Sequence, residues 1–112
     1  MKPYPKSTRC YMTDRELLEL AAKAGGYRYD EFQMCWYEGS EMREPAWNPL
    51  TDDGDALRLA VRLEMDVSFG LGGAVVEQSH GRKIQELDDD DPYAATRRAI
   101  VRAAAEIGRS MK

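Results

Sequence analysis

The strongest constraint on the fold is a long helical pattern near the C-terminus. Asp91-Pro92 is typical of a helix start, because proline is favoured in the first helical turn. Small and apolar residues then recur at helical spacing between Thr96 and Ile107, and Gly108 marks an end. The pattern predicts a helix whose apolar side must be covered by the rest of the domain.

Two earlier segments are also predicted to be helical. Thr13 to Glu16 form a capping box, and leucines and alanines follow at helical spacing until Gly25-Gly26, so we expect a helix over 14–24. Pro49 disfavours a helix before it, whereas Thr51 or Asp52 can cap one after it. A second helix is therefore expected over 52–64.

The segments between these helices have the character of strands. Gln33–Tyr37 is rich in aromatic residues, and Met65–Phe69 alternates apolar and polar residues. Ala74–Ser79 and Arg82–Leu87 flank His80-Gly81, a pattern that predicts a hairpin. The order α-β-α-β-β-β-α indicates an α+β (or α/β) domain, in which three helices cover a small, mostly antiparallel sheet.

The length of 112 residues suits one domain, expected over 12–112 with residues 1–11 as an N-terminal extension. No apolar run approaches the roughly 20 residues that a membrane helix needs, so no membrane association is expected. The first lysines are not followed by an apolar stretch, which disfavours a secretory signal. Two cysteines are too few for a disulfide framework, so we expect a cytoplasmic protein.

Acidic residues are concentrated in the middle of the chain. The net charge is −4, yet residues 51–91 carry 4 basic and 11 acidic side chains, whereas residues 92–112 carry 5 basic and 1 acidic. An acidic surface repels phosphate and attracts basic protein surfaces, so direct DNA binding is disfavoured and a basic partner is favoured. The predicted partner-binding residues are Asp52, Asp53, Asp55, Asp88, Asp89, Asp90 and Asp91. In the alternative interpretation these acids only balance helix dipoles, because both clusters lie at helix starts.

Two other groups of side chains are candidate contact surfaces. Six of the ten aromatic residues fall between positions 27 and 47, and we expect Phe32 and Trp36 among them to be internal. The candidate aromatic interface consists of Tyr27, Tyr29, Tyr37 and Trp47. The alternative nucleic-acid contacts are the arginines of the last helix, Arg97, Arg98, Arg102 and Arg109.

No motif in the chain assembles a catalytic or metal site. One histidine and two cysteines do not make a zinc site. Aligned on Gly54, a calcium loop would need ligands at Pro49 and Ala60, and neither residue offers one. The run Gly70–Gly73 lacks the third glycine of a dinucleotide loop. We therefore expect no catalytic residues, no metal and no cofactor. A domain that binds a divalent metal weakly or handles nucleotides remains the enzymatic alternative.

Two stretches resemble the phage alpha-beta-alpha (ABA) sandwich domain family. They are Trp47-Asn48-Pro49 with the acidic helix start that follows, and the late helix opened by Asp91-Pro92-Tyr93-Ala94. The resemblance covers most of residues 12–108, and its motifs are structural. It implies a helix–sheet–helix sandwich encoded by a phage or prophage, and it implies no reaction. The expected function is that of a non-enzymatic accessory protein that binds a host macromolecule. An anti-CRISPR or other anti-defence inhibitor is the most specific form of this expectation, with a basic host protein or protein–nucleic-acid complex as partner.

Overall fold

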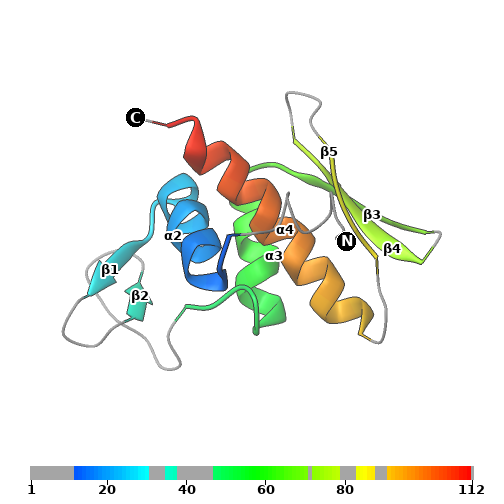
Figure 1. Ribbon diagram of the computed structural model, residues 1–112, viewed down its shortest axis with the longest axis horizontal. Coiled ribbons are helices and arrows are strands. Elements are labelled where there is room, and N and C mark those ends of the chain that lie inside the picture. The colour runs from blue at the N-terminus through cyan, green and yellow to red at the C-terminus, as the bar shows by residue number, and fades with distance from the viewer. Residues whose placement is uncertain are drawn as a thin grey trace, which may run out of the picture.

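The computed structural model describes residues 12–30, 35–37, 47–70, 72–78, 83–87 and 91–111. In these ranges the helices are α2 (Asp14–Gly25), α3 (Asp53–Arg62) and α4 (Pro92–Arg109). The strands are β1 (Arg28–Asp30), β2 (Cys35–Tyr37), β3 (Asp66–Gly70), β4 (Gly73–Glu77) and β5 (Lys83–Leu87), as Figure 1 shows. The α+β class and the predicted order of elements are confirmed, and the helix bounds differ from the predicted ones by at most two residues.

The main sheet has three antiparallel strands in the order β3-β4-β5. Its register places Ser68 opposite Val75 and Val75 opposite Gln85. The predicted aromatic strand is β2, and it pairs with β1, a strand of three residues that the sequence pattern did not indicate. The predicted His80-Gly81 turn lies outside the described residues.

Helix α4 is the central element of the fold. It contacts β4 and β5 on one side and packs against α2 and α3 elsewhere on its surface (Figure 1). The described helices thus lie on one side of the sheet, and this arrangement differs from the helix–sheet–helix sandwich that the resemblance implies. The physical reason is polarity: the other face of the sheet carries the exposed residues Asp66, Ser68, Lys83 and Gln85, which gain nothing from a second helical layer.

Small side chains let α4 pack closely on several sides. Ala99, Val101, Ala103 and Ala104 are completely buried, so the helix is covered over more of its circumference than one apolar stripe predicts. At Gly108 the backbone of α4 comes so close to the carbonyl of Leu20 in α2 that a Cβ atom would overlap it. The two helices can therefore meet at this point only through glycine.

The helix starts are stabilised by side-chain caps, and the capping box predicted at Thr13 is confirmed. The Thr13 hydroxyl accepts a hydrogen bond from the Glu16 N–H, and the Glu16 carboxylate accepts one from the Thr13 N–H. Asp52 caps α3, and Asp91 caps α4. In the described parts of the chain, no helix combines the length and the apolar character needed to cross a bilayer.

The packing of α4 predicts opposite effects of alanine at two helical glycines. Gly108→Ala should lower the free energy of unfolding by about 2 kcal/mol or more, because the new Cβ meets the backbone of α2. Gly54→Ala is the control: its Cβ would meet only side-chain ends of Arg58 and Asp52, so the change should be neutral or stabilise by up to about 1 kcal/mol. Urea denaturation followed by circular dichroism measures both, and equal effects would contradict the packing at Gly108.

Candidate functional site

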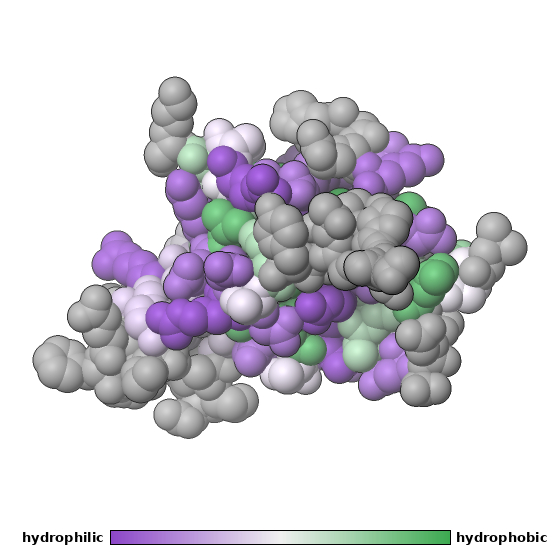
Figure 2. Space-filling model, viewed as in Figure 1, coloured by the Kyte–Doolittle hydropathy of each residue, from purple (hydrophilic) through white to green (hydrophobic). Residues whose placement is uncertain are grey.

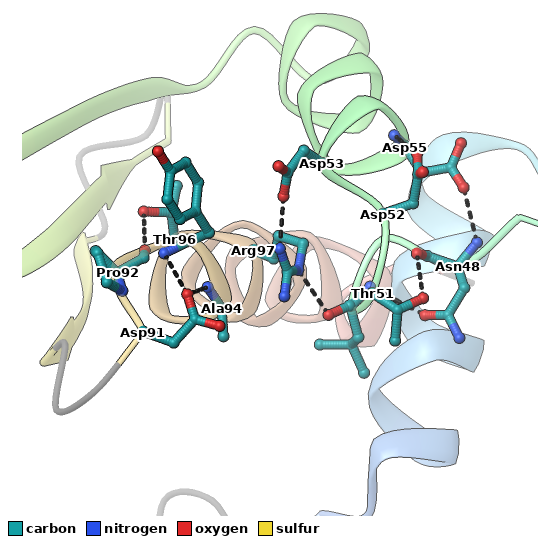
Figure 3. Close-up of polar contacts among 12 residues, drawn as sticks. Asn48, Thr51, Asp52, Asp53, Asp55, Asp91, Pro92, Ala94, Thr96 and Arg97 are labelled. Carbon is teal, nitrogen blue, oxygen red and sulfur yellow. Dashed lines mark hydrogen bonds and ion pairs between the residues drawn. The ribbon is translucent and has the colours of Figure 1, made fainter.

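The N-terminal ends of the three helices lie at one end of the molecule, and arginines of α4 connect them. The Arg98 guanidinium contacts the Asp14 carboxylate at the start of α2, with 2.9 Å between nitrogen and oxygen. The Arg97 guanidinium contacts the Asp53 carboxylate at the start of α3 at 2.5 Å and donates a hydrogen bond to the Leu50 carbonyl at 2.8 Å (Figure 3). Helix starts that are far apart in sequence therefore share one surface, which we call the acidic end.

A shallow groove with a volume of about 370 Å³ opens at the acidic end. Residues from α2, from the segment before α3, from β5 and from α4 line it. They are Asp14, Leu50, Thr51, Glu86, Leu87, Asp91, Ala94, Ala95 and Arg98. Three of these nine side chains are carboxylates and one, Arg98, is a guanidinium, so the lining is net negative and suits contact with cationic groups.

At the start of α3, the N-cap Asp52 and the first-turn residue Asp55 have structural roles. The Asp52 carboxylate accepts a hydrogen bond from the Asp55 N–H at 2.8 Å. Asp55 is only 1% exposed, and its carboxylate accepts a hydrogen bond from the Asn48 N–H at 2.9 Å (Figure 3). The same carboxylate contacts the Arg58 guanidinium at 2.9 Å. The hydrogen bond to Asp55 raises the pKa of Arg58 above its usual value. Because the Asp55 side chain is buried, it lies beneath the surface on which partner contacts were expected.

Asp53 and Asp91 remain at the surface. The Asp53 side chain is 66% exposed, whereas the Arg97 side chain that it contacts is 16% exposed, so the carboxylate is the outer member of this pair. Asp91 is exposed and accepts hydrogen bonds from the N–H groups of Tyr93 and Ala94 (Figure 3). Asp88, Asp89 and Asp90 lie outside the described residues, in the segment between Leu87 and Asp91.

The arginines of α4 are engaged within the protein. Besides Arg97 and Arg98, Arg102 contacts the Glu86 carboxylate at 2.6 Å and donates to the Gln85 carbonyl, which ties α4 to β5. Arg109 contacts Glu106 on its own helix at 3.6 Å. Sequence reasoning missed Asp14 and Glu86 as partners. Glu86 lies in the acidic segment 51–91, so the excess of basic residues after that segment was a signal for its pairing, whereas no such signal singled out Asp14.

Part of the candidate aromatic interface belongs to the core. Tyr27 and Trp47 are 8% and 2% exposed, and their rings stack with centroids 4.1 Å apart. These two residues therefore do not form an exposed patch, because each ring covers the other. Trp36 approaches Trp47 edge-on and is partly buried, as is Tyr29, whereas the side chain of Tyr37 and the whole of Phe32 lie outside the description.

The described residues contain no group of three or more histidine, cysteine or acidic side chains arranged to hold a metal ion. What the acidic end offers is a set of surface carboxylates around a groove, which can bind cations of a macromolecule by charge complementarity. Comparison of the chain with protein-family models, with curated proteins and with solved structures found no match.

The environments of Asp55 and Asp53 predict that substitution by alanine lowers the free energy of unfolding more at Asp55 than at Asp53. Asp55→Ala should lower the free energy of unfolding by about 2 kcal/mol, because the partly buried Asn48 N–H loses its acceptor. Asp53→Ala removes an exposed ion pair in the same helical turn and should cost no more than about 1 kcal/mol. Chemical denaturation of both variants measures the difference, and a larger cost at Asp53 would contradict the roles assigned here.

Proposed function

We propose that this protein is a non-enzymatic binding protein that uses its acidic end to contact a basic surface of a macromolecular partner. The observation that carries the proposal is the convergence of the helix starts around a groove lined by Asp14, Glu86 and Asp91. Carboxylates from three separate segments face the same space, and a basic groove or ridge on a partner provides the complementary charge.

The charge balance at the acidic end supports a negative surface. Arg97, Arg98 and Arg102 each pair with one carboxylate, which neutralises Asp53, Asp14 and Glu86 respectively. The caps Asp52 and Asp91 add further negative charge, and the chain places Asp88, Asp89 and Asp90 directly before Asp91. Since the arginine side chains are the less exposed members of their pairs, a partner approaching this end meets carboxylates first.

Binding to nucleic acid through Arg97, Arg98, Arg102 and Arg109 is the less favoured function. Contact with phosphate would require these guanidinium groups to leave carboxylates that already satisfy them. The described surface offers nothing that favours the metal-binding or nucleotide-handling alternative.

The most specific form of the proposal follows from the resemblance to the phage ABA sandwich family. In this form the protein is a phage or prophage accessory protein, and its partner is a host defence complex whose basic groove holds nucleic acid. Occupation of that groove by carboxylates would exclude the nucleic acid, which is how an anti-CRISPR or similar inhibitor would act. The support for this form is the pair of motifs around Trp47 and Asp91 together with the acidic end.

The proposal predicts competition with nucleic acid that depends on the aspartate run. The purified protein should bind an RNA-guided defence complex and displace its labelled target DNA, and the affinity should fall as salt is raised from 50 to 500 mM, about the range over which screening of surface charge becomes strong. The triple substitution Asp88→Asn, Asp89→Asn and Asp90→Asn should weaken binding at least about tenfold, because three attractive charges are lost.

A matched control removes the same charge elsewhere. Glu64→Gln, Asp66→Asn and Glu77→Gln together neutralise three carboxylates at the start of β3 and on the outer face of the sheet. This variant should retain affinity within about threefold of the original protein, since the charges lie away from the acidic end. Binding that ignores salt, or an equal loss in the two variants, would rule out the acidic end as the contact surface.

A further inference from the structure

We infer that β3 is a dimerisation strand, which pairs antiparallel with β3 of a second copy of this chain around a two-fold axis at Ser68. The pairing would extend the three-stranded sheet to six strands. It involves a different surface from the acidic end and does not depend on the proposed function.

The outer edge of β3 presents hydrogen-bonding groups that no described strand uses, since β3 is the first strand in the order β3-β4-β5. Gly70 and Gly73 are the first and last residues of the turn between β3 and β4, which makes them a hydrogen-bonded pair. Such pairs alternate along an antiparallel ladder. Val67 and Phe69 therefore direct their N–H and C=O groups away from β4, toward the free edge.

The opposite edge of the sheet provides an internal check on this alternation. By the same alternation, the N–H and C=O groups of Gln85, in the middle of β5, point away from β4 toward the outer edge of the sheet. There the Gln85 carbonyl accepts a hydrogen bond from Arg102 of α4. Charged side chains commonly protect edge strands in this way, and Arg102 protects β5. In β3, the residues whose backbone groups point to the outer edge are Val67 and Phe69, and neither is charged.

The sequence of β3 is complementary to itself in the antiparallel direction. A two-fold axis at Ser68 places Val67 of one copy opposite Phe69 of the other, and both pairs can exchange two backbone hydrogen bonds. The side chains of Val67 and Phe69 lie on the same face of the sheet as Val76 and Ile84, which belong to or pack against the core. Around Gln85, by contrast, β5 would place Ile84 opposite Glu86 and leave an apolar side chain against a charge.

The free edge carries an exposed apolar side chain. Phe69 is 71% exposed although it lies on the helix side of the sheet. Val61 and Leu57, on the helix that precedes β3 in the chain, are 67% and 63% exposed. Figure 2 shows hydrophobic atoms at the surface over the end of the molecule where β3 and β4 lie. In the antiparallel dimer, Phe69 of one copy approaches the start of β3 in the other, close to where α3 ends.

The surface area that this pairing would bury fits a weak homodimer. The Phe69 side chain exposes on the order of 150 Å² per copy, and five residues of paired backbone add roughly 250 Å². The total for two copies, roughly 800 Å², lies below the about 1,200 Å² of standard specific interfaces, so we expect a weak dimer with a dissociation constant in the high micromolar range. A dimer formed in this way is closed by its symmetry and does not continue into fibres.

Cysteine cross-linking tests the register directly. Opposite residues at the axis form a non-hydrogen-bonded pair with Cα atoms about 4.5 Å apart, which a disulfide can join. With Cys10→Ser and Cys35→Ser in the background, Ser68→Cys should form a disulfide-linked dimer at least about ten times faster than Gln85→Cys. Gln85 is the matched control, because it is also exposed, on the same outer face and in the middle of an edge strand. Equal rates for the two variants would overturn the inference.

Sedimentation velocity from micromolar to millimolar concentration tests the dimer without cysteines. The unmodified protein should reach twice the monomer mass, and Phe69→Lys should raise the dissociation constant at least about tenfold, because the substitution acts twice in a symmetric dimer. Leu87→Lys makes the same change at a 60% exposed residue of β5 and should leave dimerisation intact. A protein that stays monomeric throughout, or that dissociates with Leu87→Lys instead, would contradict pairing through β3. Since each copy carries a net charge of −4, added salt should screen the repulsion between copies and strengthen this dimer. The same salt should weaken binding of the acidic end to the proposed basic partner.

Discussion

The close approach of other elements to α4 is the constraint on which the rest of the structure depends. The helix replaces the large apolar residues of an ordinary core with alanine, valine and glycine, so α2, α3 and the sheet can all come near its axis. Gly108 is the extreme case, where the backbone of α2 occupies the space of a side chain. A helix covered on several sides leaves few positions that are not fully buried, and Arg97, Arg98 and Arg102 occupy three of the partly buried ones. The arrangement of charge therefore follows from the arrangement of small residues.

The arginines of α4 give the acidic residues two roles at once. Arg97, Arg98 and Arg102 join the starts of α3 and α2 and the strand β5 to the central helix. The same pairs hold carboxylates at one end of the molecule, where the positive ends of three helix dipoles also lie. Balancing dipoles and presenting a negative surface are thus compatible. Asp91 caps α4, and the three aspartates before it, at 88–90, exceed what the described contacts of α4 require.

Local signals in the sequence were sufficient to predict the helices and most strands, but they did not predict which residues of these elements contact one another. Caps such as Thr13, Asp52 and Asp91 act on backbone groups within three residues, so the helix starts could be predicted from neighbours alone. The burial of Asp55 could not, because it depends on Asn48 and on the packing of α3. Strand β1 was missed since a strand of three residues has no measurable alternation. The ion pairs that join α4 to other elements connect residues 16 to 84 positions apart, and composition indicated only that opposite charges were available.

Native-state hydrogen exchange measures most directly whether α4 is the element that holds this fold together. If it is, the amides between Ala99 and Ala105 exchange only through global unfolding, with an opening free energy equal to that measured by denaturation. The amides of β1 and β2, which pair over three residues, should open at much lower free energy. Exchange of the α4 amides through local opening, at a free energy below that of α2 or β4, would contradict the central place given to this helix.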